Sequence, residues 1–320
     1  MLKGENIMKK ISLKTNEAAT LSECFESYIT QCTVRNLSEK TIAIYKLHFS
    51  ILQRYLADES FPASEVTPDT VDGFILYLKG RGCNDITVQS YLRDIRAFLY
   101  HCMDNGSVPS FKIKLPKADK AIKETYTDEE LRLLLKKPNL KNCGFSEYKT
   151  WVFSNYLLAT GNRISSALNI KISELDFDNS LIQISKTKNR KAQLIPMSGS
   201  LAPVLREYLG YRKGEADEYV FCNAYGNKAD LRTYQEMLAR YNKSRGVTKT
   251  SAHLYRHTFA KKWILNGGDI FRLQKLLGHS DLTVVKEYVN MFNKDLSQNF
   301  DQFNPLDTMS LYQNKPKIAI

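Results

Sequence analysis

The chain has 320 residues, of which 43% are hydrophobic and 25% charged, and its formal net charge is +12 at pH 7. This length exceeds what one hydrophobic core usually organises, so two domains are expected. No apolar run approaches the length of a transmembrane helix, and the first twenty residues hold no apolar core of signal-peptide length. A cytoplasmic protein without a membrane partner is therefore expected.

The basic excess lies mainly in the second half. Residues 1–123 contain 17 Lys and Arg against 14 Asp and Glu, whereas residues 124–320 contain 29 against 20. A cationic surface attracts polyanions, most commonly nucleic acid, although a solvated basic surface without a partner is the alternative. The six cysteines show no metal-ligand spacing, which favours reduced, buried thiols.

The first half reads as four amphipathic helices that follow an N-terminal tail, residues 1–19. Apolar side chains recur at helical spacing over 21–34, 38–56, 67–80 and 87–103. Ser38 is placed to cap the second helix, Pro68 falls at the first position of the third, and Asn105-Gly106 follows the fourth. Short connections between four helices predict a compact helical domain over residues 20–107.

Residues 108–124 differ in character, because prolines interrupt any helix and lysines greatly outnumber acidic residues. The segment is predicted to be a basic linker, which is either simply solvated or lies along a phosphate backbone. Its candidate DNA-binding residues are Lys112, Lys114, Lys117 and Lys120.

The second half is predicted to be a mixed α/β domain over residues 125–297, followed by a C-terminal tail, 298–320. Helices are expected from Thr127 and over 147–159, and residues 164–176 are expected to continue as a helix before entering a strand. Residues 180–197 predict a β-hairpin with a polar tip. Most of the remainder reads as helical, with residues 219–223 as a candidate short strand.

An arginine and a His/Arg cluster are the first candidates for chemistry. Arg163 stands at the junction of two predicted helices, where an arginine usually only caps carbonyls or pairs with a carboxylate. His253, Arg256 and His257 lie within about one helical turn. Zinc is disfavoured, because no Glu stands between the histidines, no third ligand is evident and an arginine would repel the cation. As hydrogen-bond donors, these residues suit a phosphate.

Two further segments carry candidates. His279 follows Gly278 at a predicted helix C-terminus, and Tyr288 falls two turns into the next helix, where its ordinary role would be core packing. Lys186 lies near the end of the first hairpin strand. The residues of the hairpin tip, which are either solvated or in contact with a DNA backbone, are Lys188, Arg190 and Lys191.

Taken in order, these segments resemble the tyrosine recombinase (phage integrase) family, most closely its two-domain, Xer-like members. ATGNRISSALNI (159–170) is similar to the family's motif TGLRxSEL, HLYRHTFA (253–260) to HxLRHTFA, and LLGHSDLTVVKEYV (276–289) to LLGHxxxxxTxxYxH. The resemblance covers roughly residues 20–300. It implies a multidomain α and α+β fold, with a four-helix, SAM-like core-binding domain before a mainly helical catalytic domain that contains a small β-sheet.

The chain departs from the family pattern at a few positions. Asn162 and Tyr255 stand where the family usually has leucine, Ser166 where it has glutamate, and Asn290 where a histidine is common. The hairpin reads ISKTKNRK instead of GKGxKxR. The family's catalytic lysine therefore corresponds to Lys186 or to Lys188, with Lys186 preferred.

The resemblance implies site-specific DNA recombination by strand cleavage and rejoining, with no metal, ATP or other cofactor. Arg163 and Arg256 would stabilise negative charge on the phosphate oxygens, and Tyr288 would attack to form a 3′-phosphotyrosyl link. By the same resemblance, His253 would be the general base and Lys186 the general acid. His279 would donate a hydrogen bond to the phosphate. His257 is expected to be structural.

Further expectations concern partners. The resemblance implies duplex DNA sites, a homotetramer on DNA from a free monomer or weak oligomer, and a C-terminal tail that docks on a neighbour through Phe300, Phe303 and Leu306. An accessory directionality factor is a further candidate. Integration and excision of a mobile element is favoured over chromosome dimer resolution, because the termini are longer than in dimer resolvases; resolution and DNA inversion stay open.

Three rival interpretations are weaker. A type IB topoisomerase shares the chemistry but is disfavoured by the four-helix N-terminal domain. A catalytically inert DNA-binding protein is disfavoured by the intact set of candidate residues. A basic RNA-binding protein lacks support, because no RNA-binding signature is present.

Overall fold

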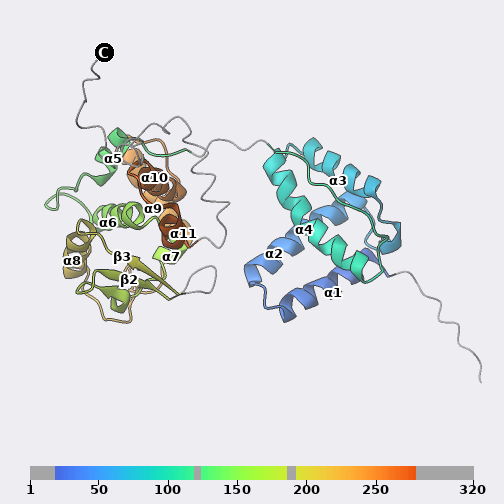
Figure 1. Ribbon diagram of the computed structural model, residues 1–320, viewed down its shortest axis with the longest axis horizontal. Helices are drawn as coiled ribbons and strands as arrows, with labels where there is room; N and C mark the ends of the chain where they lie inside the picture. Colours follow the sequence, from blue (N-terminus) through green and yellow to red (C-terminus); the bar gives the residue numbers. More distant parts are fainter. Residues whose placement is uncertain (1–18, 119–123, 186–191, 279–320) are drawn as a thin grey trace, which may run out of the picture. The chain divides into compact units, whose positions relative to one another are not determined.

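The computed structural model describes residues 19–118, 124–185 and 192–278, and the chain divides into two compact units, residues 1–121 and 122–320. Figure 1 shows that the regular elements described in the first unit are all helices, and that in the second unit a small sheet lies at one edge of a group of helices. The multidomain α and α+β fold expected from the sequence is therefore confirmed.

Four helices build the described part of the first unit, and each begins where the sequence supplies a cap. They are α1 (Leu21–Val34), α2 (Glu39–Leu56), α3 (Pro68–Gly80) and α4 (Asp85–Asp104), with the 3-10 turn η1 (Ala63–Glu65) before α3. The Ser38 hydroxyl accepts a hydrogen bond from the Thr41 N–H at the start of α2. Because Asn84 caps α4, that helix begins slightly earlier than the apolar pattern alone predicts.

The segment predicted as a basic linker is partly built into the first unit. Val108 and Ile113 are buried in its core. Lys112 and Lys114 flank Ile113 and, like Lys117, are exposed. The segment up to about residue 115 is therefore an extended arm that packs through its apolar residues and presents its lysines to solvent.

One helix organises the second unit. Helix α6 (Phe145–Thr160) is apolar on nearly all sides, with Trp151, Phe153 and Leu157 buried, which is the pattern of a core helix. The helices that contact it are α5 (Asp128–Leu135), α8 (Leu201–Arg212), α9 (Leu231–Ser244) and α10 (Ala252–Leu265). Because α6 is held on several sides, the residues at its C-terminal end have fixed positions.

The predicted hairpin is part of a three-stranded antiparallel sheet of order β1-β2-β3. The strands are β1 (Leu175–Asp176), β2 (Leu181–Ile184) and β3 (Gln193–Pro196). Ile182 pairs with Ile195, and Ile184 pairs with Gln193. Ile182, Ile184 and Ile195 are buried, so the hydrophobic effect fixes this register.

Residues 164–176 were expected to continue as a helix and then to enter a strand; the strand is found as β1, but the helix is much shorter than predicted. It consists of the four residues of α7 (Ile164–Ala167), and the 3-10 turn η2 (Ile172–Glu174) follows before β1. The Asn169 side-chain amide donates to the Ser165 carbonyl, and the Ile170 carbonyl accepts from the Val220 N–H. These bonds take the carbonyls that a longer helix would need.

The short strand expected over residues 219–223 is also wrong. Tyr219 and Cys222 each form one isolated bridge, with Lys171 and Lys228 respectively, and no ladder develops. The chain here is a loop that Val220 and Phe221 anchor by burying their side chains. An apolar run that is buried for packing can resemble a strand in sequence.

A buried polar network joins α10 to α6 and α9. The Tyr255 hydroxyl, on α10, lies 3.1 Å from Ser154 Oγ and 3.3 Å from Asn242 Oδ1. Asn242 Nδ2 donates to the Tyr126 hydroxyl and to the Lys249 carbonyl, at 2.8 Å each. Tyr255 and Asn242 are completely buried. A satisfied network of this kind fixes the orientation of α10, whereas a broken one is costly.

We expect Asn242→Leu to lower the free energy of unfolding of the second unit by about 3 kcal/mol, because it leaves buried polar partners without hydrogen bonds. Urea unfolding followed by tryptophan fluorescence measures this, since both tryptophans, Trp151 and Trp263, belong to the second unit. Asn169→Leu is the matched control: it removes a side-chain hydrogen bond at an exposed site and should cost below about 1 kcal/mol. Equal losses in the two variants would contradict the importance of the network.

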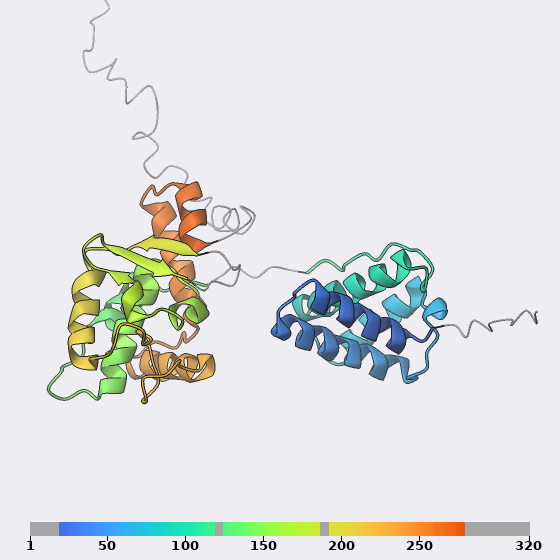
Figure 2. The same ribbon diagram turned by 90° about the horizontal axis from the view of Figure 1, so that it is seen from below.

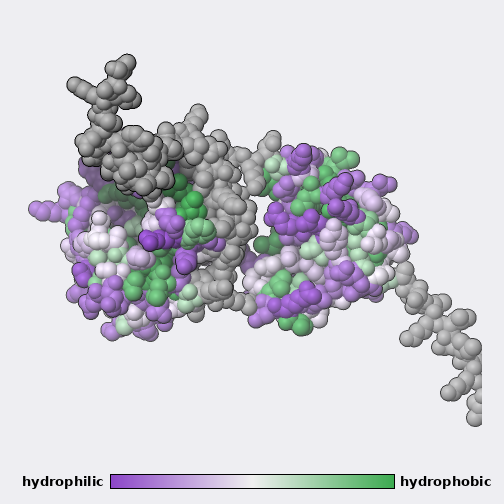
Figure 3. Space-filling model, viewed as in Figure 1, coloured by the Kyte–Doolittle hydropathy of each residue, from purple (hydrophilic) through white to green (hydrophobic). Residues whose placement is uncertain are grey.

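The described part of the chain contains no helix long and apolar enough to cross a membrane. In the view of Figure 3, the described surface of both units is mainly hydrophilic, with apolar side chains scattered over it. Scattered apolar residues of this kind are normal on protein surfaces.

Candidate active site

Arg163 lies directly after the C-terminal end of α6. The chain turns there at Gly161, whose φ of 62° is the left-handed conformation that favours glycine. A Cβ on Gly161 would come within 2.4 Å of the Phe259 ring on α10, so the backbone also approaches α10 too closely for a larger residue. Arg163, the half-buried residue that precedes α7, is thereby held beside α10.

Arg256 joins two helix ends. One guanidinium nitrogen donates to the Gly161 carbonyl at 3.0 Å and the other terminal nitrogen donates to the Leu277 carbonyl at 2.8 Å. Leu277 is the last residue of α11 (Ile270–Leu277), which ends at Gly278 with a φ of 61°, as the sequence predicts. Arg256 is only 5% exposed. A buried cation is favourable at this place because two helix C-termini direct carbonyls at it.

His253 lies in the first turn of α10, and its electrostatic neighbours are the two candidate arginines. Partial burial of the ring lowers the pKa of His253 below its ordinary value of 6.5, although the residue as a whole is exposed. The positive charges of Arg256 and Arg163 lower this pKa further. The imidazole is therefore neutral at pH 7, and the structure brings Arg163, His253 and Arg256 together at one site.

Other predicted site residues are not part of this geometry. The exposed Lys112, Lys114 and Lys117 belong to the first unit. The candidates that lie outside the described residues are Lys120, Lys186, Lys188, Arg190, Lys191, His279 and Tyr288. The residues directly before Lys186 and His279 are described: Ser185 follows β2, and Gly278 ends α11.

Two residues near the site have roles that the sequence did not reveal. Asn162, where leucine was expected, is buried, and its side-chain amide donates to the Tyr156 hydroxyl within α6. Gln193, at the start of β3, donates to main-chain carbonyls of α11 that are 82 and 83 positions away in sequence. No local sequence pattern indicates the contact of Gln193, because its partners are so far away in sequence. The buried hydrogen bond of Asn162 could have been suspected, because Asn162 is a polar residue at a motif position that is usually apolar.

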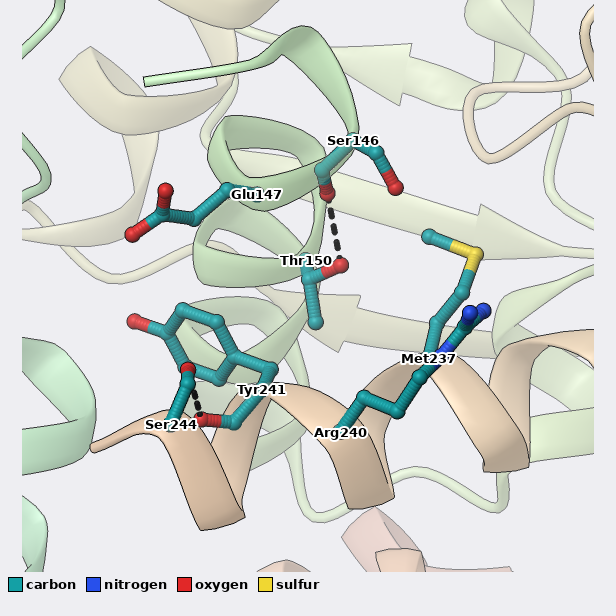
Figure 4. A pocket seen from close by; sticks show the side chains of 7 residues that line it. All are labelled: Ser146, Glu147, Thr150, Met237, Arg240, Tyr241 and Ser244. Carbon is teal, nitrogen blue, oxygen red and sulfur yellow. Dashed lines mark hydrogen bonds between the residues drawn. The ribbon is translucent and has the colours of Figure 1, made fainter. Parts of the chain in front are cut away.

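A separate groove lies between α6 and α9 and has a volume of about 280 Å³. Figure 4 shows Ser146, Glu147 and Thr150 of α6 facing Arg240 and Tyr241 of α9 across it. Of the candidate catalytic residues that the structure describes, Arg163, His253 and Arg256, none lines this groove. Within the described residues, no group of three His, Cys, Asp or Glu side chains is arranged to hold a metal ion.

Comparison with known proteins decides the family. The phage integrase family matches residues 124–294, which is more than half of the chain, and the phage integrase SAM-like domain matches residues 20–129. The chain belongs to the phage integrase family. It is a tyrosine recombinase, as the motifs predicted, and this family acts in site-specific recombination.

Similar recombinases cover most of the chain. The tyrosine recombinase XerD of Oceanobacillus iheyensis is 25% identical over 284 residues, which are 85% of this chain and 94% of the relative. XerC of Chlamydia caviae is 27% identical over 263 residues, 80% of this chain and 83% of the relative.

Solved structures share the fold. The Tn1549 transposon integrase in complex with transposon right end DNA superposes with a TM-score of 0.69 at 21% identity, covering 84% of this recombinase and 94% of that chain. A lambda integrase dimer bound to a core site gives a TM-score of 0.69 at 15% identity, covering 94% and 99%. At such low identity, these likenesses establish the fold alone.

Proposed function

We propose that this tyrosine recombinase cuts and rejoins duplex DNA at specific sites through a 3′-phosphotyrosyl intermediate, and that it thereby integrates and excises a mobile element. The observation that supports the chemistry best is the convergence of Arg163, His253 and Arg256 at the ends of α6 and α11 and the start of α10. Two cations beside a neutral imidazole suit a phosphodiester, which needs its charge stabilised and a proton removed nearby.

The arginines supply the electrostatic part of the mechanism. The transition state of phosphoryl transfer carries increased negative charge on its non-bridging oxygens, and planar guanidinium groups match those oxygens. Arg256 has little freedom to reorganise, because two of its N–H groups already bind the carbonyls of Gly161 and Leu277. Donors that are oriented before the reaction stabilise the transition state most effectively.

The proton transfers follow from the proposed roles. The Tyr288 hydroxyl oxygen attacks phosphorus and His253 accepts its proton, while the bond from phosphorus to the 5′-oxygen breaks. Lys186, or Lys188 in the alternative assignment, gives a proton to the departing 5′-oxygen. His279 donates a hydrogen bond to the phosphate. Attack by a 5′-hydroxyl of the partner strand then reverses these steps and releases the tyrosine.

The proposed partner is duplex DNA at the recombination sites. Lys112, Lys114 and Lys117, which follow α4 and are exposed, would contact phosphates of the DNA backbone. The structures of similar fold include a lambda integrase tetramer bound to a Holliday junction, so we also propose a homotetramer on DNA. An accessory directionality factor and a cytoplasmic location belong to the same proposal.

The role in a mobile element competes with Xer-type dimer resolution. The chain has diverged from XerD and XerC to 25 and 27% identity. Asn162 and Ser166, which differ from the usual first-arginine motif, are both buried next to Arg163. Integration and excision is placed first because the structures of similar fold include a transposon integrase. The names of the relatives favour resolution, which is therefore the second candidate.

Covalent capture tests the proposal. The protein is incubated with fragments of its own genomic neighbourhood and denatured, and the DNA that stays attached is sequenced. We expect DNA with defined 3′ ends, attached through those ends. Two sites that border an inserted element would support integration and excision, whereas a single chromosomal site would support resolution. Binding of the fragments without any covalent capture would overturn the proposed chemistry.

The pH dependence of capture tests the role of His253. A general base must be neutral, so the rate should fall as the pH drops through the pKa of His253. Because that pKa is lowered from 6.5, the inflection in the second-order rate constant for capture should lie below pH 6.5. An inflection above pH 6.5 would contradict the assignment. His253→Gln should remove the fall and reduce the level rate by about 10²-fold or more.

A further inference from the structure

The carbonyls in the last turn of α11 are bound by side chains from two distant segments. Gln193 Nε2 donates to the carbonyls of Lys275 and Leu276, at 2.7 Å each. Arg256 donates to the carbonyl of Leu277. The last carbonyls of a helix have no partners within the helix, so they need such donors or water. The end of α11 is therefore fixed by the tertiary structure and not by its own sequence alone.

Gln193 is itself rigidly held. It pairs with Ile184 in the sheet, and the buried Ile195 follows two positions later on the same face of β3. Figure 1 and Figure 2 both show the yellow-green strands beside the orange helix α11. A Cβ on Gly278 would lie 3.0 Å from Gln193 Oε1, so the glycine that ends α11 also leaves room for this side chain.

The contact between Gln193 and α11 connects the segment that follows the hairpin tip with the segment that precedes His279. Gln193 follows the hairpin tip, residues 186–191, which carries the candidate lysines, and Gly278 directly precedes His279. One amide therefore fixes the base of the hairpin to the helix end from which the chain continues to His279. An error of about 1 Å in such an arrangement can reduce a catalysed rate by about 10²-fold.

We propose that Gln193 is a positioning residue of the recombinase, whose amide holds the base of the hairpin against the end of α11 and thereby supports strand cleavage but not DNA binding. This inference rests on the proposed cleavage of DNA. The relevant property is N–H donation to carbonyls at the negative end of a helix, so a substitute that donates should replace Gln193 and one that cannot donate should not.

Two charge-opposed substitutions test this property. Gln193→Glu has the same length but offers carboxylate oxygens to carbonyl oxygens, and we expect the single-turnover rate of covalent capture at saturating protein to fall about 10-fold or more. Gln193→Lys keeps N–H donors and adds a cation that a helix C-terminus favours, so its rate should stay within about 3-fold of the wild type. Gln193→Met, which is uncharged and cannot donate, should be slow like Gln193→Glu.

Gln183 provides the matched control, because it lies exposed on β2 of the same hairpin. Gln183→Glu and Gln183→Lys introduce the same charges without touching α11, and they should leave the capture rate within about 2-fold. Equilibrium DNA binding, measured by fluorescence anisotropy, should agree between Gln193→Glu and Gln183→Glu. Thermal unfolding identifies any variant that does not fold, and Gln193→Met replaces Gln193→Glu in that case.

Several results would overturn the proposal. A rate for Gln193→Glu equal to that of Gln183→Glu would show that the contact does not matter for cleavage. A slow Gln193→Lys would show that donation is not the relevant property. Parallel losses of binding and rate would assign Gln193 to DNA binding. Failure of the proposed chemistry is distinct from all of these, because the wild-type protein would then capture no DNA.

Discussion

Tyr288→Phe is expected to abolish covalent capture of DNA, with a loss of at least about 10⁴-fold in rate. The reason is chemical: phenylalanine keeps the aromatic ring but lacks the oxygen that would bond to phosphorus. DNA binding should stay within about 2-fold of the wild type, because an unreacted phenol contributes at most one neutral hydrogen bond. Capture is measured as protein–DNA complex that survives denaturation, and binding is measured by anisotropy on the same DNA.

Eighteen tyrosines make a control for this variant necessary. Tyr225 is 87% exposed in the second unit, and Tyr225→Phe should capture DNA at the wild-type rate. Capture that survives Tyr288→Phe would mean that another tyrosine is the nucleophile. Sequencing the peptide that stays attached to the DNA would then identify that residue.

Arg256→Lys is expected to reduce the capture rate by about 10²-fold or more and to lower the free energy of unfolding of the second unit by about 2 kcal/mol. Lysine keeps the positive charge but cannot present the planar fork that reaches both the Gly161 and the Leu277 carbonyls. One buried carbonyl then loses its partner, and the phosphate loses a two-pronged donor. Single-turnover capture and urea unfolding measure the two effects.

Arg240→Lys is the matched control, because Arg240 lies exposed on α9 in the groove of Figure 4, away from the candidate site. Both its capture rate and its stability should match the wild type. If Arg256→Lys lost stability but kept its capture rate, Arg256 would be a structural residue only. If it kept both, neither the helix contacts nor the catalytic role would stand.

The sequence predicted those features that local chemistry determines. The helix starts at Ser38 and Thr127 follow from side chains that accept N–H groups within three residues. The helix ends at Gly161 and Gly278 follow from the left-handed conformation that glycine adopts easily. Because Arg163 directly follows one of these ends, its position relative to α6 was predictable from the motif alone.

Features that depend on long-range contacts were not predictable. Helix α7 stops after four residues because Ile170 binds Val220, fifty positions away. The contact between Gln193 and α11 likewise has no local signal. The substitution of Tyr255 for the usual leucine showed as a departure in the sequence, but only the buried partners Ser154 and Asn242 explain why a hydroxyl is acceptable there.

The bonds from Arg256 to two helix ends have a consequence for local unfolding. If the end of α6 at Gly161 opened, the Arg256 guanidinium would lose that carbonyl while it stayed bound to the Leu277 carbonyl. If the end of α11 opened, it would lose the Leu277 carbonyl and stay bound to that of Gly161. Either opening would take a carbonyl partner from a nearly buried charge, which costs more than opening a helix end that water can solvate. The turn before Arg163 and the turn before His279 therefore open and close as one cooperative unit, so the two sides of the site share a single local stability.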